Sequence, residues 1–127
     1  MRELAIIMVS GAIGTLCRFG VGRFATLVIA KPFPFGTLLV NVVGCFVFGV
    51  VMHLGTSAPL LSRTVRLAVT VGFLGAFTTF STFGFETFQF LKDGQWLPAL
   101  TNGTANMVLG LLAVWLGMIV ARALVLG

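Results

Sequence analysis

The sequence predicts an all-α membrane protein with one domain, residues 1–127, built from four transmembrane helices. The first observation is composition: 58% of the residues are hydrophobic and 9% are charged, whereas soluble domains carry about 25% charged residues. The second is the presence of four apolar segments long enough to cross a bilayer core of roughly 30 Å as helices. The alternating pattern of membrane β-strands is absent, and open sheet edges cannot face lipid.

Each helix is delimited by residues that interrupt apolar sequence. We expect the helices at residues 4–30, 35–54, 64–91 and 96–126. Residues 31–34 (KPFP) separate the first two, because proline cannot continue the helical hydrogen-bond ladder. Residues 55–59 (GTSAP) form the second loop, and residues 92–95 (KDGQ) form a short turn before the last helix. Four spans place both termini on one side of the membrane.

Positive charge is divided evenly between the two sides. One side carries Arg2, Arg63, Arg66 and Arg122, and the other carries Arg18, Arg23, Lys31 and Lys92. The positive-inside rule therefore favours neither orientation, and we expect the chain to insert both ways and to pair head to tail. The basic residues form no run or stripe, so nucleic-acid binding is not expected.

Small residues predict close association between helices. The chain has 16 glycines, many of them within the expected spans, and glycine allows backbones to approach closely in membranes. A homo-oligomer is expected, because four thin helices do not easily enclose a polar path. The lone His53 and the separate Cys17 and Cys45 provide no usual transition-metal ligand set. No catalytic constellation is present either, so the chain is not expected to be an enzyme.

The third span contains an unusual stretch, residues 77–86 (FTTFSTFGFE), most of which lies in an uncharged run over 67–85. Glycine, threonine and phenylalanine form helix weakly, so we expect a break near residues 75–79. Backbone groups freed by a break are tolerated in a membrane only when they are buried in protein or line a cavity. Freed carbonyls are suitable ligands for a hard cation such as Na⁺.

Polar and aromatic side chains at membrane depth are the candidate site residues. Phe80 and Phe83 are three apart and share a helix face, where their positive ring edges would meet an anion; ordinary packing remains the alternative. Asn41, with Thr37 one turn earlier, either donates into a pore or joins two helices. Arg18 either reaches the membrane surface or supplies positive potential at an anion entrance.

Three short segments of the chain resemble those of a known protein family. Residues 36–44 (GTLLVNVVG) and 72–83 (GFLGAFTTFSTF) resemble the signature segments of the Fluc (CrcB) fluoride channels. Residues 14–18 (GTLCR) are similar to the segment that carries the family's first-helix arginine. The resemblance covers the whole chain, and its third-helix motif is specific.

The resemblance implies a fluoride-selective channel for passive F⁻ efflux from the cytoplasm, located in the bacterial inner membrane. It also implies an antiparallel, dual-topology homodimer with two pores and a structural Na⁺ at the dimer centre. Gly75 and Thr78 would supply carbonyls to Na⁺, Phe80 and Phe83 would be the pore phenylalanines, and Asn41 would be the polar pore residue of the second helix.

The fourth helix matches less closely. Asn106 stands where some relatives have serine, and Asn102 stands where some have tyrosine. Fluoride is tightly hydrated, so a pore must replace its water with neutral donors that bind strongly enough for entry and weakly enough for exit. The donors expected along the pore are Asn41, Asn106, Thr37, Ser81 and Thr82, with Arg18 at the entrance.

The main alternative function is a small dual-topology multidrug or cation exporter. Such proteins need a deep acid in the first helix to couple protons to a cationic substrate. Here that helix contains Arg18 and no deep acid, which favours the channel. A structural subunit without transport activity is the third reading, and ion flux through liposomes distinguishes it.

Overall fold

The computed structural model describes residues 1–29, 32–58 and 60–126, and every regular element in them is a helix. Four helices are long and apolar enough to cross a membrane: Arg2–Ile29, Phe35–Ser57, Arg63–Lys92 and Trp96–Leu126. The predicted all-helical chain with four candidate spans is confirmed. Lys31, which contributed to the expected charge balance, lies outside the described residues.

The spans divide into shorter elements where the helical geometry changes. In chain order they are α1 (Arg2–Ile29), α2 (Phe35–Met52), the π-helical turn η1 (His53–Ser57), α3 (Arg63–Leu67), the π-helical segment η2 (Ala68–Leu74), α4 (Gly75–Phe77), α5 (Phe80–Lys92) and α6 (Trp96–Leu126). The third span is therefore made of α3, η2, α4 and α5. Between α5 and α6, Gly94 adopts a positive φ of 69° that favours glycine.

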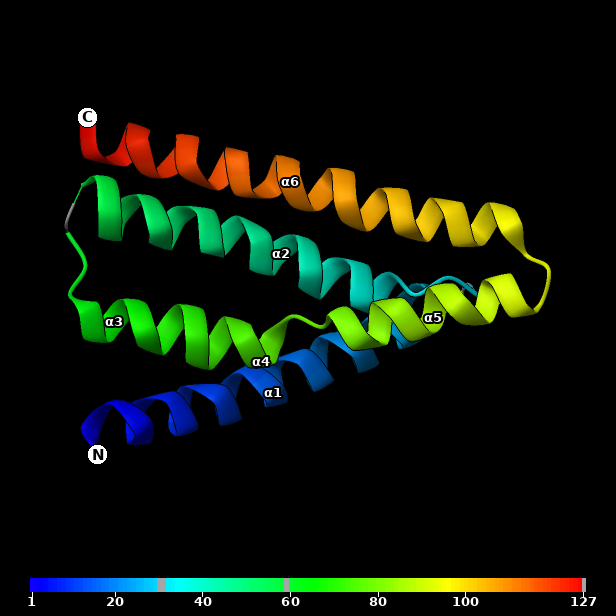
Figure 1. Ribbon diagram of the computed structural model, residues 1–127, viewed down its shortest axis with the longest axis horizontal. Helices are drawn as coiled ribbons and strands as arrows, with labels where there is room; N and C mark the ends of the chain where they lie inside the picture. The colour runs from blue at the N-terminus through cyan, green and yellow to red at the C-terminus, as the bar shows by residue number, and fades with distance from the viewer. Residues whose placement is uncertain (30–31, 59, 127) are drawn as a thin grey trace.

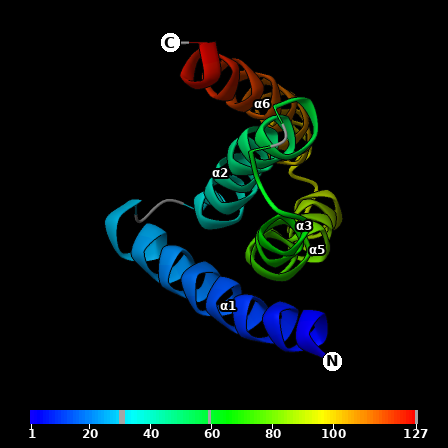
Figure 2. The ribbon, with the colours of Figure 1, turned by 90° about the vertical axis from the view of Figure 1, so that its left-hand side faces the viewer.

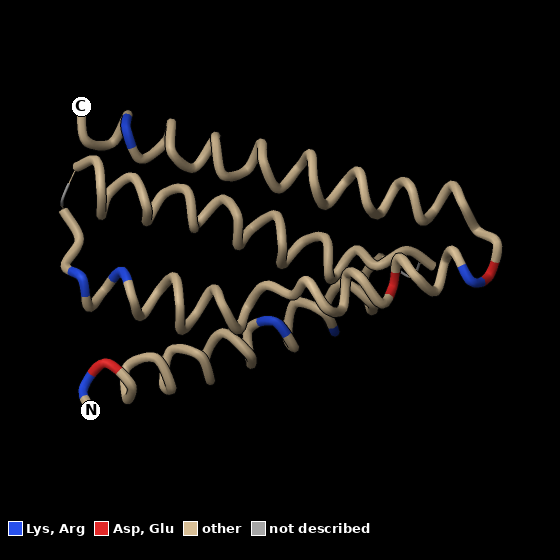
Figure 3. Tube along the Cα trace, in the orientation of Figure 1, with Lys and Arg blue, Asp and Glu red and all other residues tan. Residues whose placement is uncertain are grey.

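The spans run alternately up and down, so both termini lie at one end of the bundle with the α2–α3 connection (Figure 1). In the end view, α6 and α1 lie on the two outer sides, with α2 and the third span between them (Figure 2). The most extensive packing joins α2 to α6 and α1 to η2. Charged residues gather mainly near the two ends of the bundle (Figure 3).

Glycines allow the helices of these two pairs to touch backbone to backbone. A Cβ added at Gly49 of α2 would overlap the Val114 carbonyl of α6, and one at Gly117 would overlap the Phe46 carbonyl. Each of the two helices thus presents a glycine to a backbone carbonyl of the other. Close approach of this kind supplies the van der Waals packing that joins helices in lipid.

The first span meets the third in the same manner. A Cβ at Gly14 of α1 would overlap the Phe73 carbonyl, and one at Gly72 would overlap the hydroxyl of Ser10. Ser10 itself donates to the Ile6 carbonyl, 2.7 Å away, and so leaves no unpaired hydroxyl in the apolar segment. The first half of the third span is thereby held against α1.

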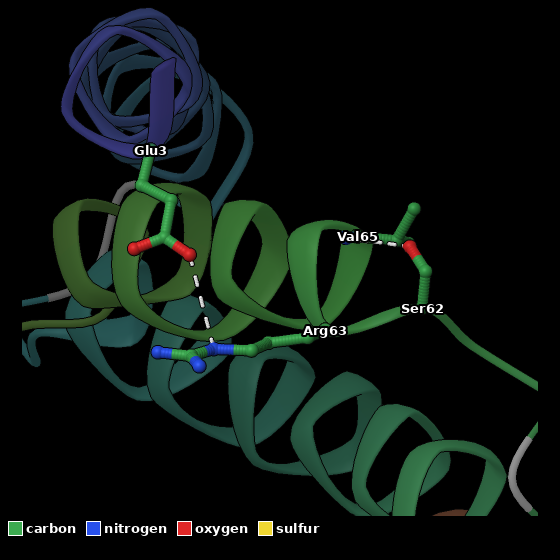
Figure 4. A network of polar contacts seen from close by, with 4 residues as sticks. All are labelled: Glu3, Ser62, Arg63 and Val65. Carbon is green, nitrogen blue, oxygen red and sulfur yellow. Dashed lines mark hydrogen bonds and ion pairs between the residues drawn. The ribbon is translucent and has the colours of Figure 1, made fainter. Parts of the chain in front are cut away.

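One end of the bundle carries a small polar cluster (Figure 4). Ser62 caps α3, its Oγ accepting from the Val65 N–H at 3.3 Å. Arg63 Nε lies 3.8 Å from Glu3 Oε1, and both side chains are largely exposed. Arg66 donates to the Gly55 carbonyl at 3.0 Å, tying η1 to the start of the third span.

The third span is broken at two residues. Thr78 has φ −82° and ψ 159°, and Thr79 has φ −149° and ψ 110°, which are extended conformations. Helix resumes at Phe80, where the Thr79 hydroxyl caps α5 by accepting from the Thr82 N–H at 3.2 Å. The break lies within the interval that the weak helix formers predict.

Candidate functional site

A cavity of about 500 Å³ lies beside the break. Residues from α2, the third span and α6 line it. Six predicted site residues are among them: Asn41, Gly75, Thr78, Phe80, Phe83 and Asn106. The structure therefore brings the main candidates from three helices to one place, although they are far apart in the sequence.

The Asn41 side chain substitutes for helical hydrogen bonds that the break removes. The Thr79 N–H donates to Asn41 Oδ1 at 2.9 Å, and Asn41 Nδ2 donates to the Thr79 carbonyl at 3.3 Å. One amide thus pairs with both backbone groups of one residue, as a neighbouring β-strand would. This pairing meets the requirement that backbone polar groups inside a membrane find partners within the protein.

Four carbonyls on the near side of the break are left without a helical partner. In the described part of the chain, the carbonyls of Gly75, Ala76, Phe77 and Thr78 accept no hydrogen bond from a backbone N–H. Gly44 of α2 makes room here, because a Cβ at this position would overlap the Thr78 side chain. A set of neutral carbonyl oxygens suits a hard cation.

A chain of amides extends from Asn41 into α6. Asn41 Nδ2 donates to Asn106 Oδ1 at 2.9 Å, and Asn106 Nδ2 donates to Asn102 Oδ1 at 3.1 Å. Asn102 is fully buried, with 0% of its surface exposed, and it donates to Thr87 Oγ1 at 2.9 Å. Asn102 and Asn106, which are four residues apart on α6, therefore form a hydrogen-bonded pair.

The two candidate phenylalanines form the aromatic wall of the cavity. Their ring centroids are 5.6 Å apart and the rings are inclined by 55°, a geometry in which one ring directs its edge toward the other. Phe80 is 82% exposed in the single chain, whereas Phe83 is half-buried. Because the Phe80 ring is exposed, one side of this wall is open in the single chain.

Thr37 lines a second cavity of about 420 Å³ near the start of α2. Its hydroxyl donates to Glu86 Oε1 at 2.8 Å. Glu86 lines the same cavity, and its Oε2 has no hydrogen-bond partner among the described residues. Glu86 was not among the predicted site residues, although its position at the end of a long uncharged run was a usable signal.

Ser81, Thr82 and Arg18 are absent from the described lining of both cavities. Ser81 and Thr82 are exposed at the start of α5, where Thr82 accepts from the Thr79 hydroxyl at 2.9 Å. Arg18 is half-buried on α1, four residues before Gly22, which lines the second cavity. That spacing places Arg18 on the helix face that leads to this cavity.

Thr79 and Thr87 are site residues that sequence reasoning missed. Their role depends on partners 38 and 15 residues away, and local patterns carry no such information. Within the described residues, no group of three or more His, Cys, Asp or Glu side chains is placed to hold a metal ion. Any cation at the break would therefore depend on backbone carbonyls.

Comparison with known proteins gives a consistent result. Residues 5–118 match the family described as CrcB-like protein, Camphor Resistance (CrcB). The chain is 44% identical over 124 residues to a "Fluoride-specific ion channel FluC" of Citrifermentans bemidjiense, covering 98% of this chain and 100% of the relative. It is 43% identical over 127 residues to the protein of the same name in Pelobacter propionicus, covering 100% of this chain and 98% of the relative.

Proposed function

The chain belongs to the CrcB-like family, and from that premise we propose that it is a fluoride-specific ion channel. It is a multi-pass membrane protein and not an enzyme, and its full-length relatives bear the fluoride-channel name. The observation that carries the proposal is the cavity at the break, which combines the amides of Asn41 and Asn106 with the rings of Phe80 and Phe83 and, among the described residues, has no charged side chain in its lining. The physiological role is passive escape of F⁻ from the cytoplasm across the bacterial inner membrane.

The chemistry of the cavity suits a small, strongly hydrated anion. Asn41 Nδ2 makes one bond of 2.9 Å and one of 3.3 Å, and the longer one is the weaker. An arriving fluoride takes the place of the Thr79 carbonyl as acceptor, while the ring edges of Phe80 and Phe83 offer weak positive potential. Neutral donors replace water without the deep well that a buried arginine would create.

The path toward solution follows one face of α2. Thr37 lies four residues before Asn41, which places both on the same helix face, and Thr37 opens onto the second cavity. We propose that the ion passes between the two cavities along this face. Arg18, on the α1 face that leads to the second cavity, supplies positive potential at its mouth, while Ser81 and Thr82 offer hydroxyls at the start of α5.

We further propose a structural Na⁺ held by the carbonyls of Gly75 and Thr78. These oxygens accept no backbone N–H within the described residues, and hard oxygen donors are what Na⁺ takes. The ion would neutralise the negative ends of exposed peptide groups. A cation density surrounded by backbone oxygens at this point in an experimental map is the expected result, and ordered water alone would contradict it.

The proposed assembly is an antiparallel homodimer. The exposed Phe80 and the open cavity leave a wall that a second, inverted copy would complete. To test it, single cysteines are placed at either terminus after Cys17 and Cys45 are replaced by alanine, and each is labelled from outside intact cells. Labelling of both termini in part of the population is expected, and one uniform orientation would overturn dual topology.

The function itself is tested by ion efflux. Purified protein is reconstituted into liposomes loaded with fluoride, and release is followed with a fluoride electrode after the membrane potential is set with valinomycin. Rapid F⁻ release with no comparable Cl⁻ release from chloride-loaded vesicles is expected. Release no faster than from protein-free liposomes would overturn the proposal and favour a structural subunit.

A further inference from the structure

We propose that Asn102 and Thr87 are positioning residues that, together with the Thr79 backbone, hold the Asn41 amide with its nitrogen toward the cavity. Neither residue lines that cavity within the described chain, so neither would touch an ion there. They act through a run of hydrogen bonds that reaches Asn41 from α6 and α5. This inference rests on the proposed channel function, because its consequence is the direction of a donor to fluoride.

The run, here called the amide ladder, consists of five bonds in which every group donates to the next. They are Thr79 N–H to Asn41 Oδ1 at 2.9 Å, Asn41 Nδ2 to Asn106 Oδ1 at 2.9 Å, Asn106 Nδ2 to Asn102 Oδ1 at 3.1 Å, Asn102 Nδ2 to Thr87 Oγ1 at 2.9 Å, and Thr87 Oγ1 to the Phe83 carbonyl at 2.8 Å. The donors all point the same way from the break into α5.

Backbone groups at both ends favour this direction. The Thr79 N–H donates and cannot accept, and the Phe83 carbonyl accepts and cannot donate. The first fixes Asn41 with its oxygen toward the break. The second accepts the Thr87 hydroxyl proton, which leaves a lone pair of Thr87 Oγ1 to accept from the Asn102 nitrogen. The two ends therefore demand the same orientation of every amide between them.

Because the Asn102 side chain is buried, water could not replace the hydrogen bonds that would be lost if its amide turned over. Asn102 is 0% exposed, so turning its amide would place nitrogen against Asn106 Nδ2 and oxygen against Thr87. Asn106 Nδ2 would keep its second bond, to the Asn102 backbone carbonyl at 3.0 Å, but the turned Asn102 nitrogen would lose its acceptor Thr87 Oγ1, and a buried donor without an acceptor is costly in a low-dielectric interior. The ladder thus transmits the orientation set at Phe83 to the far end at Asn41.

This orientation decides the sign of the charge that an ion meets. In the ladder, the Asn41 oxygen is turned to the Thr79 N–H, and its nitrogen serves the cavity side shared with Asn106. A reversed amide would present oxygen to the ion and repel an anion. The Thr79 backbone and two residues outside the cavity therefore act together to keep Asn41 a donor.

The test compares two substitutions at the same position. Thr87→Val keeps the shape and removes the hydroxyl, and Thr87→Ser keeps the hydroxyl. Thr15→Val is the matched control: Thr15 also donates to the carbonyl four residues earlier, at 3.0 Å, but it is exposed on α1 and lies outside the ladder. Fluoride efflux from liposomes is measured for each at equal amounts of monodisperse protein.

Thr87→Val is expected to slow fluoride efflux about fivefold or more, the effect of one lost hydrogen bond, while Thr87→Ser and Thr15→Val release fluoride like the parent. A second readout follows the side-chain amide ¹H–¹⁵N signals of Asn41 in detergent micelles. These should move in Thr87→Val and stay in place in Thr87→Ser and Thr15→Val.

The outcomes separate the inference from the function. A conducting parent with unchanged efflux and unchanged Asn41 signals in Thr87→Val would overturn the ladder and leave the channel intact. A slowing of all three variants alike would also overturn it, because it would indicate general loss of helix stability. A non-conducting parent would overturn the proposed function, and the Asn41 signals would still decide the ladder.

Discussion

The two halves of the third span, on either side of Thr78 and Thr79, are held in the protein by different forces. Before the break, η2 and α4 bury Gly72, Leu74 and Phe77 and pack closely against α1. After the break, α5 has no buried residue at all. Its links to α2 and α6 include hydrogen bonds between side chains, such as Thr37 to Glu86 and Asn102 to Thr87.

The two halves of the third span therefore differ in the kind of interaction that holds them in place. Van der Waals packing holds η2 and α4, and it depends on shape and on the absence of side chains at glycines. Hydrogen bonds hold α5, and they depend on which atom faces which. In the proposed channel, the polar half places the donors for the ion, and the apolar half fixes the span.

Gly14→Val should give the largest effect, since it attacks the packed half. The new side chain would overlap the Phe73 carbonyl, and overpacking typically costs about 1–3 kcal/mol or more. We expect a lower free energy of unfolding in SDS titrations and a reduced yield of monodisperse protein. Gly20→Val is the control, because a Cβ at Gly20 has no neighbour within 4 Å. Equal stability of the two variants would show that the packed half does not depend on this contact.

Asn41→Leu should give the next largest effect, now on the polar half. It leaves the Thr79 N–H and Asn106 Oδ1 without their partner and removes the donor that we propose for the ion. We expect fluoride efflux from liposomes to fall between tenfold and a hundredfold, about 1.4–2.8 kcal/mol. Val43→Leu, a change of size at an exposed α2 position, should conduct like the parent. Parental efflux from Asn41→Leu would show that the polar half positions no essential donor.

Phe80→Ile and Phe83→Ile should have a smaller effect, because apolar bulk is retained and only the ring edge is lost. A ring contact is worth about 0.5–1.5 kcal/mol, so we expect efflux to fall by up to about tenfold with the elution volume unchanged. Phe88→Ile, at a position 60% exposed toward the far end of α5, is the control. If all three conduct equally, the phenylalanines only pack and the ion path runs elsewhere.

Glu3→Gln should have the smallest effect. The Glu3–Arg63 pair spans 3.8 Å between side chains that are 55% and 78% exposed (Figure 4), and exposed ion pairs contribute about 0–1 kcal/mol. We expect the free energy of unfolding to change by less than about 0.5 kcal/mol in SDS titrations. A larger loss would mean that charge, as well as packing, anchors the start of the third span.

The contrast between the halves also explains which features could be predicted from the sequence. The four spans follow from apolar length, and the break follows from weak helix formers, because both are local properties of the chain. Gly75, Thr78, Phe80 and Phe83 lie within that one motif and were predicted together. Few polar side chains lie at membrane depth, and Asn41 and Asn106 were identified because they are among them.

The hydrogen-bond partners of these residues could not be predicted from local sequence patterns. Thr79 had no feature to distinguish it from Thr78, and its importance comes from Asn41, 38 residues earlier. Glu86 and Thr87 depend on Thr37 and Asn102, which reach them across helix interfaces. A hydrogen bond between distant side chains is fixed by packing angles that periodicity does not encode.

The order in which these groups leave the ribosome has a consequence for assembly. Asn41 is already synthesised when Thr79 emerges 38 residues later, so the break finds its backbone partner at once. Asn106, which follows Asn41 by 65 residues, arrives about 1–5 s after Thr79 at translation rates of 5–20 residues per second. During that interval the nascent third span has its break but lacks the α6 groups that orient Asn41. The hydrogen bonds around Asn41 can therefore be completed only after the start of the final helix has been made.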